Sequence, residues 1–174
     1  MVYSSVTEAS KLGLMTGLDN GYFGTNISMN RAMVACVFHR MEGNKKVAYS
    51  NVFSDVKDGQ YYTTSVMWAK ANGVINGYKN GTYKPLQNIT REEMAVMLYN
   101  FAEYKGVDTR SDKDLTQFTD YNQISDYAIP AVKWAIENGL ISGKLNGSKI
   151  DPKATATRAE CAKMLVEAFN TIYK

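Results

Sequence analysis

The chain has 174 residues, 45% of them apolar, and a formal net charge of +3 at pH 7. The apolar fraction is sufficient for a packed core. Lysine and arginine are scattered along the chain, which argues against a nucleic-acid-binding surface, and no apolar run is long enough to cross a membrane.

One pattern occurs three times in the chain, and it is clearest around Arg91 and Arg158. Each of these arginines follows a threonine, and each is preceded by a Trp-Ala pair, a glycine-flanked apolar segment and an Asn-Gly pair. A weaker copy is anchored on Arg31. The first copy is degenerate and lacks the Phe-x-Asp opening of the others. We therefore expect three repeats, at residues 1–52, 53–117 and 118–174.

Each repeat is expected to begin with a helix and to continue through a turn-rich loop. Residues 61–72 have helical periodicity and end at Gly73, and residues 127–138 repeat that pattern. In the loops that follow, Asn-Gly pairs supply the positive φ of tight turns, and Pro85 and Pro152 prevent helix formation. We expect short strands to flank these turns.

A second helix then begins at a capping residue. A threonine followed three residues later by a glutamate is the pattern of a capping box, in which each side chain accepts a hydrogen bond from the other residue's amide. The predicted pairs are Thr90 with Glu93 and Thr157 with Glu160. In the first repeat Asn30 can cap the helix, but Met33 cannot close the box.

The second helices carry apolar stripes at helical spacing. The stripes are Val34, Val37, Phe38 and Met41; Met94, Met97, Leu98 and Phe101; and Cys161, Met164, Leu165 and Ala168. One such helix cannot bury its apolar face alone. The expected fold is therefore mainly α, with three helix-loop-helix repeats in a pseudo-threefold arrangement around a central three-helix bundle and short strands in the loops.

An arginine occupies the first turn of the second helix in all three repeats, at positions 31, 91 and 158. A cation there faces the positive end of the helix dipole, which costs roughly 0.3–1 kcal/mol, so an anion is expected nearby. Two alternatives are open. The anion is a carboxylate of the protein, such as Glu92, Asp55 or Asp120, or it is an external carboxylate or phosphate held by the guanidinium and free helix amides.

The motifs Phe-x-Asp, Trp-Ala, Gly-Val/Leu-Ile-x-Gly, Asn-Gly and Thr-Arg-x-Glu, in that order, resemble the S-layer homology domain. The resemblance covers essentially the whole chain and is specific in the second and third repeats. It implies a non-catalytic module that anchors a bacterial protein to the cell wall. The implied ligands are acidic secondary cell wall polysaccharides, pyruvylated in many members of the family, which bind in grooves between adjacent repeats.

The resemblance also implies an extracellular location, at the bacterial cell wall or cell surface. The start Met1-Val2-Tyr3-Ser4 does not have the pattern of a signal peptide. Because a wall anchor must be exported, we expect the chain to be a module of a longer secreted protein.

The resemblance assigns the glycan's carboxylate to Arg91 and Arg158, and to Arg31 by position. Tryptophan and glycine are further candidates, although packing and turn chemistry are the first interpretations of these residues. The glycan-binding candidates are thus Arg31, Arg91, Arg158, Trp68, Trp134, Gly77 and Gly143. The first repeat lacks both the tryptophan and the box glutamate, so we expect fewer than three working grooves.

Other functions lack sequence support. Cys36 and Cys161 occupy non-equivalent positions and predict two buried free thiols, and His39 has no identifiable catalytic partner. Zinc spacings, calcium loops, phosphate loops and nucleophile elbows are absent, so we expect no metal, no cofactor and no enzyme activity. The alternative to glycan binding is a protein-interaction or surface-assembly module, in which the arginines pair with a partner's acidic residues.

Overall fold

The computed structural model describes residues 2–174, with side chains from Ser4 onwards, and this part of the chain is mainly helical. Met1, part of the N-terminal pattern considered above, lies outside the described residues. Three long helices begin at the motif arginines: α2 (Arg31–Met41), α4 (Arg91–Tyr104) and α6 (Arg158–Ile172). The shorter elements are α1 (Val2–Lys11), α3 (Thr63–Ala71), α5 (Ile129–Glu137) and the 3-10 turns η1 (Tyr121–Gln123) and η2 (Asp126–Ala128).

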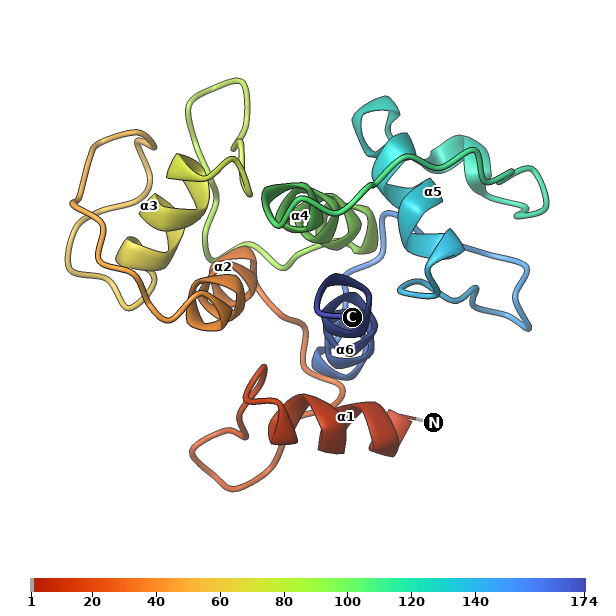
Figure 1. Cartoon of the computed structure of the whole chain (residues 1–174), viewed down its shortest axis with the longest axis horizontal. Helices are drawn as coiled ribbons and strands as arrows, with labels where there is room; N and C mark the ends of the chain where they lie inside the picture. Colours follow the sequence, from red (N-terminus) through yellow and green to blue (C-terminus); the bar gives the residue numbers. More distant parts are fainter. Residues whose placement is uncertain (1) are drawn as a thin grey trace.

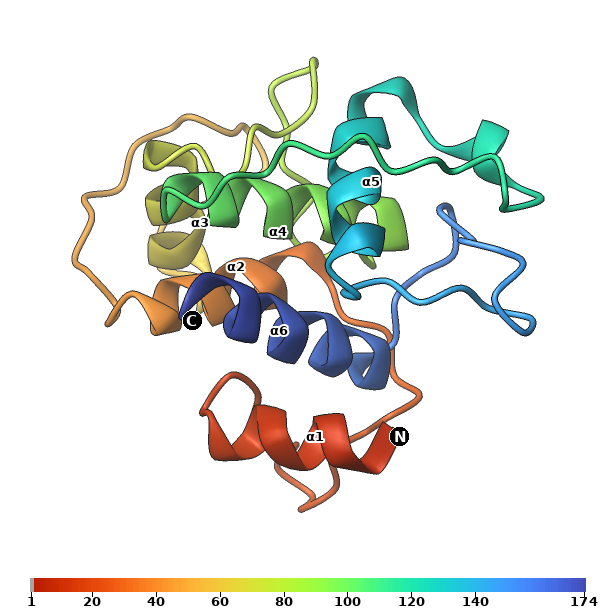
Figure 2. The same ribbon diagram turned by 45° about the vertical axis from the view of Figure 1, so that its right-hand side comes forward.

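The short α-helices lie outside the long ones. In Figures 1 and 2, α2, α4 and α6 lie next to one another, and α1, α3 and α5 lie around them. Each short helix packs against the long helix of a different repeat: α1 against α6, α3 against α2, and α5 against α4. A helix, its loop and the following helix are therefore not a self-contained packing unit, because each repeat is completed by a neighbour.

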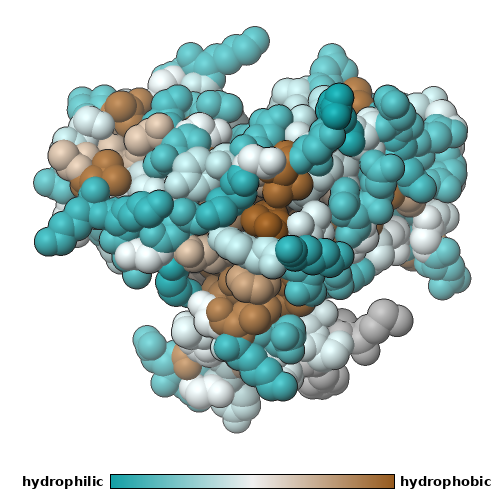
Figure 3. All heavy atoms as spheres, viewed as in Figure 1, coloured by the Kyte–Doolittle hydropathy of each residue, from teal (hydrophilic) through white to brown (hydrophobic). Residues whose placement is uncertain are grey.

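The long helices bury the predicted apolar stripes, with the exception of Met41, which is only partly buried. Phe38 of α2 and Phe101 of α4 are fully buried and stack with their ring centroids 4.6 Å apart. Burial of each such ring contributes about 1.5–3 kcal/mol to stability. Figure 3 shows a surface that is largely hydrophilic, with hydrophobic residues gathered near the middle of the face seen in Figure 1.

The segments that precede the long helices are joined by a closed ring of backbone hydrogen bonds. Ile89 donates to the carbonyl of Met29, Met29 donates to that of Ala156, and Ala156 donates to that of Ile89, at 2.9, 3.1 and 2.9 Å. All three residues are buried. Because buried amides must be paired, this ring fixes the starts of the three long helices relative to one another.

The prediction of short strands in the loops is wrong for residues 2–174, where extended segments form only isolated bridges. These bridges are Ser28 with Thr157, Asn30 with Asn88, Thr90 with Thr155 and Lys144 with Lys149. Elsewhere in the loops, backbone amides donate to side chains instead of to a second strand. The amides of Tyr83 and Lys84, for example, donate to the Asp55 carboxylate at 2.8 and 2.7 Å.

One carboxylate links the other ends of the long helices. Glu42, the C-cap of α2, accepts from the ammonium of Lys105 at 2.7 Å and from the hydroxyl of Tyr173 at 3.3 Å, and these residues are the C-caps of α4 and α6. It also accepts from Lys45. Burial alone would raise the pKa of Glu42, but the hydrogen bonds from Lys105 and Lys45 outweigh it and lower that pKa.

Replacement of Glu42 by glutamine is expected to lower the free energy of unfolding by about 1.5–3 kcal/mol at neutral pH, because charge-assisted hydrogen bonds are lost. A lowered folded-state pKa stabilises the protein fully above the unfolded pKa of about 4.3, and this contribution is lost as the pH falls through the folded-state value. Denaturant unfolding of both proteins as a function of pH measures the effect.

The difference in the free energy of unfolding between Glu42→Gln and the unmodified protein should therefore become smaller as the pH falls below about 4.3. Glu137→Gln, at an exposed position on α5, is the control and should change stability little at any pH. If the free energies of unfolding of Glu42→Gln and of the unmodified protein changed with pH in parallel, the role given to this carboxylate would be contradicted.

Candidate functional site

The predicted capping boxes are present at the starts of α4 and α6. The Thr90 hydroxyl accepts from the amide of Glu93 at 3.3 Å, and the Glu93 carboxylate accepts from the amide of Thr90 at 2.9 Å. Thr157 and Glu160 make the same two contacts at 3.3 and 2.9 Å. Each box encloses its arginine, Arg91 or Arg158, and so fixes that residue in the first helical turn.

Each motif arginine extends from its own helix into the loop of another repeat. The Nε groups of Arg31, Arg91 and Arg158 donate to the carbonyls of Tyr83, Ile150 and Phe23, at 2.9, 2.8 and 2.7 Å. All three arginines are 7% exposed or less. The arginines thus lie at three contacts between repeats, which we call the Arg31, Arg91 and Arg158 junctions.

Two of the three guanidinium groups pair with the capping-box glutamate of the next repeat. Arg31 Nη1 lies 2.9 Å from Glu93 Oε1, and Arg91 Nη1 lies 3.2 Å from Glu160 Oε1. In each glutamate, Oε2 closes the capping box while Oε1 accepts from the arginine. The partner at these two junctions is therefore a carboxylate of the protein, which offsets the unfavourable position of a cation at a helix start.

The three carboxylates proposed above as arginine partners have other roles, so that choice of residues is wrong. Asp55 and Asp120 each accept hydrogen bonds from two consecutive loop amides. Glu92 is buried and accepts from the ammonium of Lys153 and from the amide and hydroxyl of Ser125. These contacts hold the loops against which the arginines lie.

The degenerate first repeat keeps the same loop conformation by a different means. Lys84 and Asp151, whose amides donate to Asp55 and Asp120, have left-handed φ values of 55° and 56°. The equivalent residue in the first repeat, seven positions before its arginine, is Gly24, with φ 69°. Glycine adopts this conformation without steric strain, so the loop does not depend on an aspartate there.

The alternative of an external anion included free helix amides around the arginines, but the first two amides of each long helix are already paired. The backbone amides of Arg31, Arg91 and Arg158 donate to the carbonyls of Gln87, Ala154 and Ile27, at 3.0, 3.0 and 2.7 Å. The next amide along each helix also donates to a carbonyl of another repeat. Contacts between repeats therefore use the donors that would otherwise bind an anion.

The predicted tryptophans lie in the core. Trp68 and Trp134 are each 1% exposed, with His39 stacked on Trp68 at a centroid distance of 5.4 Å and Tyr99 edge-on to Trp134. Neither ring presents an edge to a groove, so the burial supports the packing interpretation. His39 is itself buried and bonded, through its ring nitrogens, to a serine hydroxyl and a backbone carbonyl.

The two predicted glycines are required by the packing of their loops. A Cβ atom on Gly77, which has φ 75°, would lie 2.3 Å from the Phe53 ring, and one on Gly143 would lie 2.6 Å from the carbonyl oxygen of Gly147. Gly77 also lines the cavity at the Arg31 junction. The turn interpretation therefore accounts for both residues, and Gly77 lies where it could also contact a ligand.

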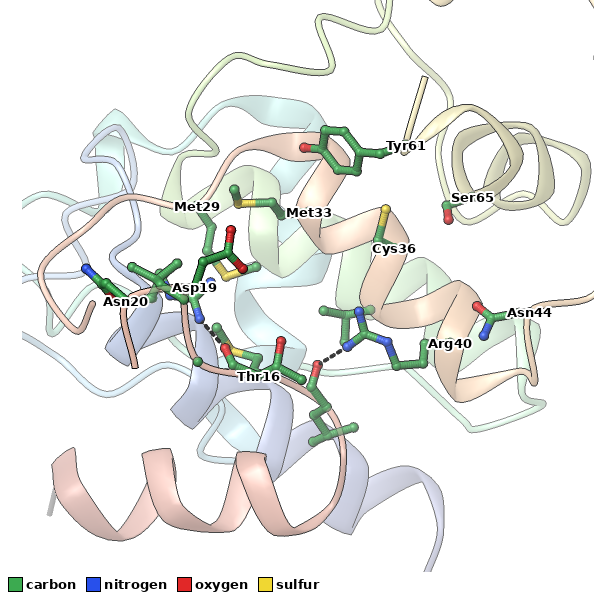
Figure 4. A pocket seen from close by; sticks show the side chains of 16 residues that line it. Thr16, Asp19, Asn20, Met29, Met33, Cys36, Arg40, Asn44, Tyr61 and Ser65 are labelled. Carbon is green, nitrogen blue, oxygen red and sulfur yellow. Dashed lines mark hydrogen bonds between the residues drawn. The ribbon is translucent and has the colours of Figure 1, made fainter. Parts of the chain in front are cut away.

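The Arg31 and Arg158 junctions each adjoin a cavity. The one at the Arg31 junction has a volume of about 450 Å³ and is lined by Tyr78, Glu93 and Tyr127, among others. The one at the Arg158 junction has a volume of about 870 Å³ and lies between the loop 14–20 and the α2 side chains of Met33 and Arg40 (Figure 4). These cavities are the candidate ligand sites.

The Arg158 junction differs in charge from the other two. Arg158 Nη2 donates to the carbonyl of Thr16 at 2.6 Å, and no carboxylate within the described residues lies within ion-pair distance of its guanidinium. Asn30 caps α2 by accepting from the amide of Met33, but Met33 occupies the place of Glu93 and Glu160 and offers no charge. Burial lowers the pKa of Arg158.

Sequence reasoning did not single out Arg40 or Cys36 as residues of this cavity. Cys36 and Arg40 follow Met33 on the same helical face, at spacings of three and seven residues respectively, and this periodicity was the available signal. Both cysteines are free, but only Cys161 is buried, so the prediction of two buried thiols is wrong for Cys36. Burial raises the pKa of both thiols.

Within the described residues, no cluster of three or more His, Cys, Asp or Glu side chains could hold a metal ion. The helices described here are also too short or too polar to span a membrane.

A model of the S-layer homology domain matches residues 52–95 and 117–162, which together make up just over half of the chain. The chain therefore belongs to the S-layer homology domain family. The two matched segments begin within one residue of the expected starts of the second and third repeats and end within α4 and α6, beyond the arginine motifs.

Relatives contain similar segments within much longer proteins. The chain is 31% identical over 152 residues to an amylopullulanase of Thermoanaerobacterium thermosulfurigenes, 28% identical over 152 residues to the surface-layer 125 kDa protein of Lysinibacillus sphaericus, and 26% identical over 155 residues to a cellulosome-anchoring protein of Acetivibrio thermocellus. These alignments cover 87%, 86% and 87% of this chain but only 8%, 12% and 34% of the relatives. The predicted location at the bacterial cell surface is confirmed by the family and by such relatives.

Proposed function

We propose that the chain is a non-catalytic module that anchors a longer secreted protein to the bacterial cell wall. It does so by binding an acidic, pyruvylated secondary cell wall polysaccharide in grooves between its repeats. The family and the relatives described as surface-layer and cellulosome-anchoring proteins support the anchoring role. Relatives with enzyme names match over only a small part of their length, which supports attachment rather than catalysis.

The proposed architecture is a pseudo-threefold arrangement of three repeats, at residues 1–52, 53–117 and 118–174, around α2, α4 and α6. The closed ring of hydrogen bonds between Met29, Ile89 and Ala156 supports it, because the same position of each repeat contacts the next. The arginine Nε contacts also pass once around the three repeats, with donation in the opposite direction. In this arrangement a groove lies wherever two repeats meet.

A buried guanidinium beside a cavity at a junction between repeats is the observation that carries the proposal. Arg31 and Arg158 both line such cavities. A planar guanidinium can donate two parallel hydrogen bonds to a carboxylate, and partial burial strengthens such charge-assisted bonds. Binding of an acidic sugar in this way requires a groove and a cation, and it involves no chemical reaction.

Protein-free sacculi from the organism that carries this chain provide the test. The purified domain should co-sediment with sacculi that retain their secondary polysaccharide and should stay in solution with sacculi from which that polysaccharide has been extracted. Equal binding to both would identify peptidoglycan as the ligand. Binding to neither would favour the protein-interaction alternative, and both of these results contradict the proposal.

A further inference from the structure

The three junctions are chemically unequal. We propose that, among the described residues, the Arg158 junction alone is open to an anion, and that it binds a carboxylate-bearing sugar between Arg158 and Arg40. Arg31 and Arg91 are instead neutralised by the protein itself. This inference rests on the proposed function and names the groove that performs it.

At the Arg31 junction the guanidinium already has a counter-ion and two aromatic neighbours. Glu93 pairs with it at 2.9 Å, and the rings of Tyr78 and Tyr83 lie over it, at 4.9 and 4.8 Å from the guanidinium carbon. The Tyr78 hydroxyl also donates to Glu93 at 2.6 Å, and burial together with this bond raises the pKa of Tyr78 to about 12. An incoming carboxylate would have to displace Glu93 and leave it buried without its cation, which is strongly unfavourable.

The Arg91 junction is occupied in a similar way. The Arg91 guanidinium donates to Glu160 and to the carbonyls of Ile150 and Ser142, and its side chain is 5% exposed. Lys144 makes a second ion pair with Glu160 at 3.0 Å. An external anion would compete with a carboxylate already shared by two cations.

At the Arg158 junction nothing has to be displaced. Arg158 is 7% exposed, Phe23 covers one face of its guanidinium at 4.8 Å, and Leu18 stands at the position that Tyr78 occupies in the second repeat. Met33 brings an apolar side chain to the place of the missing glutamate. A partly buried cation without a counter-ion gains most from binding an anion, because little solvent screens the pair.

The rest of the cavity supplies the remaining features of a sugar site. Arg40 donates to the carbonyl of Leu14 at 3.2 Å, so a second cation flanks the same loop whose Thr16 carbonyl is bound by Arg158 (Figure 4). Tyr61 is 65% exposed and lines the cavity, where an aromatic face can stack on a sugar ring. Asp19, the one acidic residue of the lining, is exposed and opposes anion binding.

Met33→Glu is the sharpest test, because it gives the first repeat the glutamate of the other two. The new carboxylate can close the capping box with Asn30 and pair with Arg158, so the melting temperature should not fall. Affinity for the wall polysaccharide, measured by calorimetry, should drop by about 30-fold or more, as for loss of a buried charge pair. Met33→Gln has the same shape without the charge and should bind about tenfold more tightly than Met33→Glu.

Three further variants test the cations. Arg158→Gln should weaken binding by about 30-fold or more, and Arg40→Gln, at an exposed position, by about three- to tenfold. Arg110→Gln is the matched control, since the Arg110 side chain is 90% exposed and forms a surface pair with Asp108; its affinity should stay within about twofold.

Cys36 provides a readout that is independent of affinity. It lines the Arg158 cavity, whereas Cys161 is buried, so peptide mass spectrometry after iodoacetamide treatment can follow both thiols in one sample. Saturating wall polysaccharide should slow the alkylation of Cys36 by about tenfold, whereas Cys161 should stay unmodified in the folded protein.

The outcomes separate this inference from the proposed function. Absence of polysaccharide binding by the unmodified protein overturns both. Binding that persists in Arg158→Gln and Met33→Glu, with Cys36 alkylated at an unchanged rate, overturns the choice of groove and leaves the anchoring function standing. Loss of binding in both variants, with folding intact and Cys36 protected by the polysaccharide, is the result that we expect.

Discussion

Replacement of Glu93 by alanine should lower the free energy of unfolding by about 3–5 kcal/mol, because it leaves the buried Arg31 guanidinium without its carboxylate. The same change opens the capping box of α4, since Glu93 also accepts from the amide of Thr90. A buried charge that loses its partner costs far more free energy than the loss of a surface ion pair. Denaturant unfolding followed by circular dichroism measures the effect.

The matched control is Asp108→Ala. It removes the carboxylate of the Arg110–Asp108 pair, whose side chains are 90% and 62% exposed, and should change stability by less than about 1 kcal/mol. Equal losses in Glu93→Ala and Asp108→Ala would mean that the Arg31–Glu93 pair is no more than a surface contact, contrary to the structure described above.

Trp68→Ala should lower the free energy of unfolding by about 3–5 kcal/mol. Removal of this large, almost fully buried ring leaves a cavity that its neighbours cannot fill. The lost contacts include the stacked ring of His39 in α2 and the edge-on ring of Tyr104 in α4. The shift of the denaturation midpoint measures this loss of stability.

Trp68→Phe keeps an aromatic ring in the core and should lose clearly less stability than Trp68→Ala. A role for Trp68 as a sugar platform predicts the opposite behaviour, with stability nearly unchanged and polysaccharide affinity reduced in both variants. Such a result would contradict the burial of this residue as the explanation of its place in the motif.

Local features of the fold were predictable from the sequence because they depend on neighbouring residues. The capping pairs are three residues apart, and the apolar stripes repeat at helical spacing, so both follow from periodicity. The helical class follows from the same signals. The failed expectation of strands has a tertiary cause, since side chains such as Asp55 take the amides that a strand would have paired.

The arginine partners could not be found by looking along the chain. Arg31 and Glu93 are 62 positions apart, and Arg91 and Glu160 are 69 positions apart, so neither pair has a local signature. The available signal was the repeat itself, because a glutamate that caps with one oxygen has a second oxygen for another repeat. The loss of the free helix amides likewise results from contacts between repeats.

The structure changes the interpretation of the degenerate first repeat. Its missing glutamate suggested a weakened groove from the sequence alone, whereas the contacts suggest that Met33 leaves Arg158 available to a ligand. Fewer than three working grooves remains our prediction, with the first repeat supplying the loop and helix face of the one that we expect to bind.

The most direct measurement of the central claim is calorimetric titration of the domain with purified wall polysaccharide, before and after mild acid removal of ketal-linked pyruvate. We predict saturable binding of the untreated polysaccharide and a loss of about 30-fold or more in affinity after pyruvate removal, because the carboxylate that faces the buried guanidinium is gone. Equal affinity for both preparations would contradict recognition of an acidic group by the motif arginines.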